Sequence, residues 1–173
     1  MAIDLNYQGK QDNGSNECGA YALTACLRAL GKLPCDTRHA LLYNVPGMGW
    51  SRSAAVPPST VDPLTGADPC AQAIYAVTGM CDPQTFEYSP TLKSGVNPVS
   101  ALAWTAKQLG CAVDVWVEQT AFQTMVKAFP LEKDMTTAVL GAAPTINSAE
   151  PALGSNQVRL VLCQVPADCK RAF

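Results

Sequence analysis

The sequence has few charges and no long apolar run. Aspartate, glutamate, lysine and arginine make up 15% of its 173 residues, and the formal net charge is −2. It contains no basic stretch of the kind that binds nucleic acid and no acidic tail of the kind that stays disordered. Its apolar runs fall well short of the roughly 20 residues that a membrane-spanning helix needs. These absences favour a globular domain with a hydrophobic core of its own.

No basic segment followed by an apolar run stands at the start of the chain, so no cleavable signal peptide is predicted. We therefore expect a cytoplasmic protein, or one exported by a route that leaves no such signal. The sequence has eight cysteines but no C-x-x-C pair, which argues against a zinc ribbon and a thioredoxin-like site. No metal or other cofactor is expected. Cys70 with Cys81, and Cys163 with Cys169, are near enough in sequence to form disulfides, but a chain of this length does not need them.

The most informative segment begins at Gln11, where a polar loop leads into an apolar helical pattern. Asn16 is a preferred N-cap residue, so we predict that a helix begins near Cys18. Four apolar residues recur with helical spacing and predict one buried face: Leu23, Cys26, Leu27 and Leu30. The free N–H groups and the dipole of a first helical turn favour the thiolate of Cys18. A thiolate held on a rigid helix is a well-placed nucleophile.

Neighbouring residues fit a catalytic role for Cys18. The side-chain amide of Gln11 and the backbone N–H of Cys18 are candidate donors to an oxyanion formed beside the sulfur. Gly19 leaves room for a substrate backbone, and Asn16 is a second candidate substrate contact. Trp50 is a third; it lies in the segment 44–68, which is rich in proline, glycine and serine and is predicted to be a functional loop.

This segment resembles the nucleophile segment of papain-like cysteine peptidases, and is nearest to the branch that processes bacteriocin leaders at double-glycine sites. In that branch a glutamine precedes an acidic residue, cysteine and glycine at the start of a helix, as Gln11 precedes Glu17, Cys18 and Gly19 here. The resemblance implies a peptide or protein as substrate or partner. It also implies a single papain-like α+β domain over residues 1–173, with a helical half (about 1–110) packed on a strand-rich half (about 111–173) that holds a small, mainly antiparallel sheet.

The pattern along the chain agrees with this order of elements. Asp36 predicts a short helix over 37–43 that carries His39. Asp68 and Asn97, each followed by proline, predict helices that begin at residues 69 and 98. A further helix is predicted over 120–129, and strands are predicted over 111–117, 137–142 and 157–165.

The histidine that the resemblance implies is not where the family has it. In the family, a histidine that begins a strand in the second half takes the proton of the thiol and later protonates the leaving amine. At the corresponding place this chain reads Gly-Ser-Asn-Gln-Val over residues 154–158, and neither Asn156 nor Gln157 accepts a proton near neutral pH. His39 is the single histidine in the sequence.

Three hypotheses follow. In the first, His39 is the base, although a lone histidine on a short helix is more often a surface residue. In the second, Cys18 works without histidine, in thiol or acyl transfer with an activated substrate. In the third, catalysis is lost and the domain binds a peptide or protein partner; a toxin or effector delivered into another cell is one such protein. We predict a cysteine-dependent hydrolase or acyl/amide transferase with Cys18 as nucleophile, with the non-catalytic binding domain as the alternative. The oligomeric state is left open.

Overall fold

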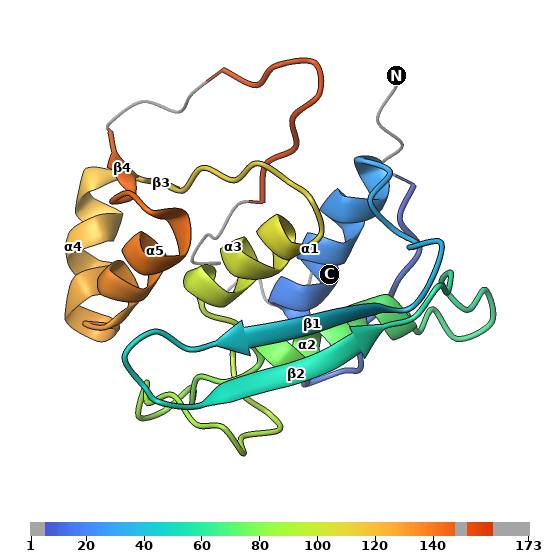
Figure 1. Cartoon of the computed structure of the whole chain (residues 1–173), viewed down its shortest axis with the longest axis horizontal. Helices are drawn as coiled ribbons and strands as arrows, with labels where there is room; N and C mark the ends of the chain where they lie inside the picture. Colours follow the sequence, from blue (N-terminus) through green and yellow to red (C-terminus); the bar gives the residue numbers. More distant parts are fainter. Residues whose placement is uncertain (1–5, 148–151, 161–173) are drawn as a thin grey trace.

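The computed structural model describes residues 6–147 and 152–160 (Figure 1). Its helices are α1 (Cys18–Ala29), α2 (Pro69–Thr78), α3 (Val99–Gln108), α4 (Gln119–Ala128) and α5 (Glu132–Leu140). Its strands are β1 (His39–Asn44), β2 (Ser51–Val56), β3 (Trp116–Val117) and β4 (Thr145–Ile146). This combination of helices with a small antiparallel sheet confirms the predicted α+β class. Within the described ranges, no helix is both long and apolar enough to cross a bilayer.

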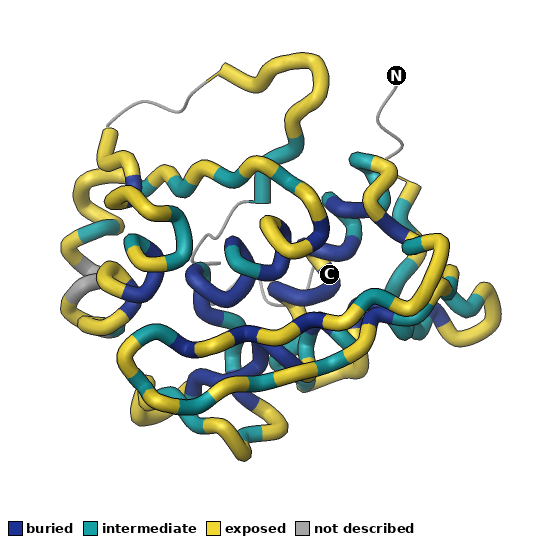
Figure 2. The backbone as a smooth tube through the Cα atoms, viewed as in Figure 1, coloured by how far each residue is buried: buried dark blue, intermediate teal, exposed yellow. Residues whose placement is uncertain are grey.

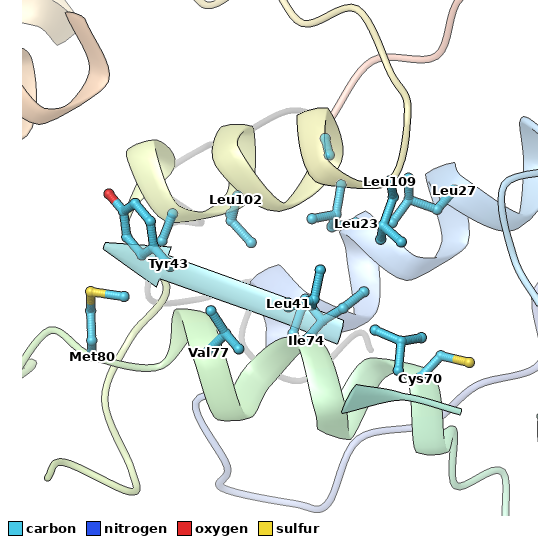
Figure 3. Close-up of a cluster of buried hydrophobic side chains, with 14 of the residues drawn as sticks. Leu23, Leu27, Leu41, Tyr43, Cys70, Ile74, Val77, Met80, Leu102 and Leu109 are labelled. Atoms are coloured by element: carbon cyan, nitrogen blue, oxygen red, sulfur yellow. The ribbon is translucent and has the colours of Figure 1, made fainter. Parts of the chain in front are cut away.

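The core lies where α1, α2 and α3 meet β1. Leu23 and Leu27 of α1 are buried, as their spacing predicted, and the helix gives way to Gly31 in a left-handed conformation. Figure 3 shows that side chains from these four elements point into one cluster. Each fully buried Leu, Ile or Val contributes about 1.5–3 kcal/mol relative to an exposed one. Figure 2 shows that buried residues concentrate on these elements, whereas the loops are mostly exposed.

The longest strands form a hairpin that the sequence pattern did not predict. β1 and β2 are antiparallel, with His39 opposite Val56 and Asn44 opposite Ser51. The helix predicted over 37–43 is therefore wrong. Leu41 is buried while its neighbours in β1 are less so, which is the alternation of a strand. Pairing with β2, inside the segment predicted to be a loop, overrides the weak helical preference of so short a stretch.

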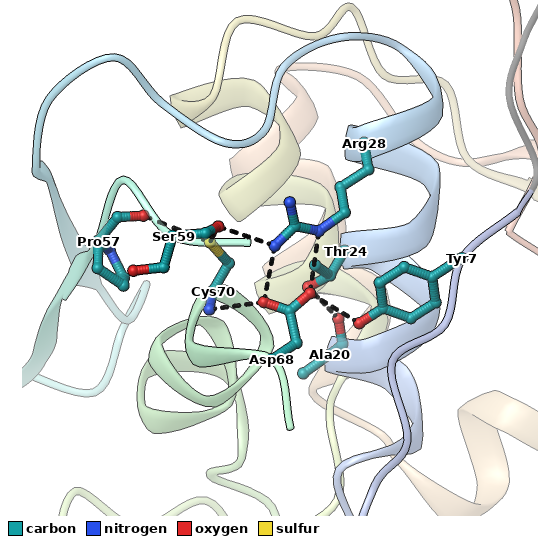
Figure 4. Close-up of polar contacts among 8 residues, drawn as sticks. All are labelled: Tyr7, Ala20, Thr24, Arg28, Pro57, Ser59, Asp68 and Cys70. Atoms are coloured by element: carbon teal, nitrogen blue, oxygen red, sulfur yellow. Dashed lines mark hydrogen bonds and ion pairs between the residues drawn. The ribbon is translucent and has the colours of Figure 1, made fainter. Parts of the chain in front are cut away.

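A buried ion pair joins α1 to the start of α2 (Figure 4). As predicted, α2 begins at Pro69 and Asp68 is its N-cap, whose carboxylate accepts a hydrogen bond from the Cys70 N–H at 2.9 Å. Arg28 of α1 donates to both Asp68 oxygens at 2.9 and 3.0 Å, and the Tyr7 hydroxyl donates at 2.9 Å. Burial opposes ionisation of Asp68, but the hydrogen bond and charge of Arg28 outweigh it, so the pKa of Asp68 lies below its usual value.

Beyond α3 the chain holds more helix and less strand than predicted. The helix predicted over 120–129 is confirmed as α4, but α5 lies where a strand was predicted over 137–142. Acidic residues in the first turn of α5 and left-handed Gly141 at its end are ordinary helix signals. Of the strand predicted over 111–117, only Trp116–Val117 forms a strand, β3. This strand pairs in parallel with β4. Of the strand predicted over 157–165, residues 157–160 form none, and the remainder lies outside the described residues.

The predicted order, with helices first and the sheet after them, is therefore reversed in part. The hairpin of β1 and β2 lies before residue 110, and two helices follow that residue.

Candidate active site

Cys18 is the first residue of α1, and its side chain is exposed. The prediction that Asn16 caps the helix is wrong. Glu17 is the N-cap residue and makes no capping hydrogen bond, while the Asn16 amide donates to the Ser94 carbonyl at 2.7 Å. The first N–H groups of a helix have no partner within it. These N–H groups must therefore find acceptors outside the helix or stay free to bind a ligand.

Asn97, which precedes α3, provides the cap. Its Oδ1 accepts a hydrogen bond from the Ala20 N–H at 2.9 Å, and its Nδ2 donates to Thr78 Oγ1 at 3.3 Å. Gly19 is buried against this amide, because a Cβ there would lie 2.5 Å from Asn97 Oδ1. The space beside Gly19 that the sequence assigned to a substrate backbone is thus occupied by the Asn97 side chain.

Two backbone donors remain at the exposed end of α1. Among the described residues, no hydrogen-bond acceptor lies within reach of the N–H groups of Cys18 and Gly19. The next two N–H groups are engaged: Ala20 donates to Asn97, and Tyr21 donates to the Glu17 carbonyl at 3.0 Å. A sulfur beside two available donors at a helix N-terminus is a favourable place for an anion.

His39 lies at the other end of α1. It pairs with Val56, three residues before Ser59, whose carbonyl accepts a hydrogen bond from Arg28 near the C-terminal end of α1. The rise from Cys18 to Arg28 is about 15 Å. The end of α1 lies against the start of α2 through Arg28 and Asp68, so the start of α1 lies near the end of α2. Arg52 of β2 donates to the Ala76 and Gly79 carbonyls at the end of α2. The end of the hairpin opposite His39 is therefore the one that faces the start of α1. The structure therefore does not bring His39 and Cys18 together.

Gln11 and Trp50, two further residues of the predicted site, lie in segments that contact other parts of the fold. The N–H of Lys10 donates to the Gly66 carbonyl at 2.7 Å, so the segment passes the loop that leads to α2 before it reaches α1. The Gln11 side chain is partly buried and has no hydrogen-bond partner among the described residues. Trp50 lies at the turn of the hairpin, where it packs against the core beside Met48.

Two side chains near Cys18 were missed at the level of sequence. Tyr75 of α2 donates its hydroxyl proton to the Gly95 carbonyl at 2.9 Å. Burial raises the pKa of Tyr75, the nearby charge of Glu17 adds to the rise, and Arg52 opposes it. Asn97 was assigned as a cap for the helix that follows it. Asparagine is a common capping residue, but the residues around Asn97 do not show that it caps α1 and not α3.

A surface hollow of about 370 Å³ lies elsewhere. It is lined by Met48 and by residues 85–88 and 129–131, and Phe86 packs edge to face on Phe129 with 4.6 Å between the ring centroids. None of its lining comes from α1 or α2, so it is separate from the surroundings of Cys18.

Comparison with known proteins gives the family of the chain. A family model described as "Invasion plasmid antigen J, cysteine protease" matches residues 10–168, which is most of the chain. The chain belongs to the IpaJ protease family. Membership confirms the predicted cysteine-peptidase class and implies a peptide or protein substrate. The nearness to the bacteriocin-leader branch and the papain-like arrangement stay predictions. No curated protein and no solved structure matches the chain.

Proposed function

We propose that Cys18 is the nucleophile of this IpaJ-family protein, which hydrolyses or transfers an acyl group of a peptide or protein. The observation that carries the proposal is an exposed sulfur at the start of α1, beside the N–H groups of Cys18 and Gly19, which have no acceptor among the described residues. The thiolate attacks the acyl carbon, and the oxyanion accepts a hydrogen bond from the Cys18 N–H and one from the Gln11 amide. The leaving group departs and a thioester is left at Cys18; the acyl group then passes to water or to an acceptor as the C–S bond breaks and the thiolate is released.

The presence or absence of a proton donor decides which acyl bonds the site can break. The amine of a peptide bond leaves only once it has gained a proton, and a histidine placed beside the sulfur is the usual donor. His39 lies near the other end of α1, so the proposal gives it no part in this transfer. The site therefore suits acyl bonds with a good leaving group, such as an ester or thioester.

Alkylation tests the nucleophile directly. Iodoacetamide should modify Cys18 faster than every other cysteine, with buried Cys70 and Cys81 as internal references. Tryptic peptide 11–28 holds Cys18 and Cys26, and fragmentation distinguishes the two. If Cys18 reacts no faster than it does in concentrated urea, it is not an activated nucleophile.

Acyl transfer is tested with a p-nitrophenyl ester. We expect a burst of about one equivalent of p-nitrophenol per chain, because an acyl-enzyme accumulates when its breakdown is slow. Cys18→Ser should abolish the burst, whereas Cys35→Ser, at a partly buried cysteine, should retain it.

A non-catalytic binding domain is the second candidate, and the separation of His39 from Cys18 favours it. It predicts fast alkylation of Cys18 without any burst. It also predicts that Cys18→Ser leaves the affinity for the partner unchanged.

A further inference from the structure

The segment 94–97 holds the residues on both sides of Cys18. The Ser94 carbonyl accepts from the Asn16 amide at 2.7 Å, two residues before the sulfur. Asn97 Oδ1 accepts from the Ala20 N–H at 2.9 Å, two residues after it. Between them, the Gly95 carbonyl accepts from the Tyr75 hydroxyl. One short segment, remote in sequence, therefore fixes the backbone that carries the thiol.

The Asn97 amide is itself held in one orientation. Its Nδ2 donates to Thr78 Oγ1, and that hydroxyl donates to the Ile74 carbonyl at 3.0 Å inside α2. Thr78 is fully buried. The acceptor oxygen of Asn97 is left to face α1, where a Cβ on Gly19 would lie 2.5 Å from Oδ1 and 2.8 Å from Cβ of the asparagine. Only glycine allows so close an approach.

We propose that Asn97 is a positioning residue for Cys18, acting as a neutral cap that orients the first turn of α1. This inference rests on the proposed role of Cys18 as nucleophile. Asn97 takes up the Ala20 N–H and so leaves the N–H groups of Cys18 and Gly19 for the thiolate and the oxyanion. A carboxylate at the same place would make the same hydrogen bond, but its charge would oppose the thiolate.

Other charged groups near the sulfur also influence how readily Cys18 ionises. Glu17 precedes Cys18, and Tyr75 faces it from α2, with Arg52 of β2 near the tyrosine. These groups stay constant when residue 97 is changed. A neutral amide at position 97 therefore adds no further negative charge to a site that already has Glu17.

The test is the pH dependence of Cys18 alkylation in Asn97→Asp. Aspartate caps a helix as well as asparagine does, so the variant should fold. A full negative charge against the first turn of α1, partly exposed to solvent, should raise the pH midpoint of the alkylation rate by roughly half a unit to one unit. At pH 7 the rate should fall about 3- to 10-fold. Gln108→Glu makes the same amide-to-carboxylate change at an exposed position, at the end of α3 that is remote from Asn97, and should keep the wild-type profile.

A folded Asn97→Asp with the wild-type profile overturns the inference, because a purely structural cap would behave in that way. A second pair of variants makes an independent test. Gly19→Ala should push the amide away from the Ala20 N–H and slow alkylation, as Asn97→Ala should. The double variant should be no slower than the slower single variant, because both changes break one contact. Rates that multiply would show two independent effects and overturn the inference.

Failure of the two proposals can be told apart. If wild-type Cys18 reacts no faster than it does in urea, the nucleophile role itself fails and the role of Asn97 fails with it. If wild-type Cys18 reacts fast and Asn97→Asp is unchanged, only the role of Asn97 fails. Should Asn97→Ala not fold, the Asn97→Asp profile decides.

Discussion

Glu132, the first residue of α5, is a buried carboxylate that should make the stability of the protein depend on pH. Its side chain is only 3% exposed, and it accepts hydrogen bonds from the Ser100 N–H and hydroxyl and from the Tyr88 hydroxyl. It thereby caps α3, whose own N-cap residue is Pro98 and makes no side-chain capping bond. No cation pairs with it among the described residues. Burial raises the pKa of Glu132, although hydrogen bonds from Tyr88 and Ser100 oppose the rise.

The sign follows from proton linkage. The folded state binds the Glu132 proton more tightly than the unfolded chain does, so this group's contribution to stability is fully present below the unfolded pKa of about 4.5. That contribution is lost as the pH rises through the elevated folded pKa. Glu132→Gln removes the ionisation and should flatten this part of the curve. Glu132→Ala leaves four donors without this acceptor, the fourth being the Thr136 hydroxyl, and should lower the free energy of unfolding by about 3 kcal/mol at pH 7.

Urea denaturation at pH 4, 5, 6, 7 and 8 measures both effects. Glu132→Ala should lower the midpoint at unchanged slope, and a loss of about 3 kcal/mol corresponds to a melting temperature about 6–12 °C lower for a chain of this size. Glu87→Gln makes the same chemical change at an exposed position in the neighbouring loop and should leave the midpoint unchanged. A Glu132→Ala midpoint equal to that of the wild type, or a Glu132→Gln curve with the wild-type pH dependence, would refute the reasoning.

Four further predictions concern other buried groups. Arg28→Ala should lower the free energy of unfolding by about 3–5 kcal/mol, because it leaves Asp68 buried without its partner; urea denaturation checks this. The pKa of Asp68 is lower in the folded protein than in the unfolded chain. The contribution of Asp68 to the free energy of unfolding is therefore present above the unfolded pKa and is lost as the pH falls through the folded pKa. Asp68→Asn should remove this part of the acid transition. Tyr43→Phe should leave the melting temperature unchanged or raise it, because its buried hydroxyl has no partner among the described residues. Burial raises the pKa of Cys81 to about 11, so Cys81 should be among the slowest thiols in an alkylation time course at pH 8, and equal rates for all cysteines would contradict this.

The features that the sequence predicted correctly have local causes. The buried face of α1 depends on the spacing of residues such as Leu23 and Leu27, and α2 begins where an aspartate precedes a proline. Each signal lies within a few residues of the element it specifies. The same is true of the exposed thiol at the start of α1, which depends only on a polar loop that meets an apolar helix.

The features that the sequence did not predict depend on pairing between distant segments. β2 reads Ser-Arg-Ser-Ala-Ala-Val, with only Val56 fully buried, and it becomes a strand because β1 pairs with it. The placement of His39 follows from that pairing, so the sequence alone could not separate it from Cys18. Asn97 caps a helix 77 residues away in the chain, although it stands directly before a helix of its own.

The surroundings of Cys18 are arranged around the thiol and its backbone donors. Residues 94–97 accept three hydrogen bonds that hold its neighbours, and the structure places the single histidine near the far end of the helix. Under the proposed function, an arrangement that fixes the sulfur but supplies no imidazole should form an acyl-enzyme from an ester or thioester more readily than it cleaves a peptide bond. The order of reactivity toward a thioester, an ester and an amide that share one acyl group would therefore measure how far this IpaJ-family site departs from that of a peptidase. A site that cleaved the amide as readily as the ester would require a proton donor close to Cys18.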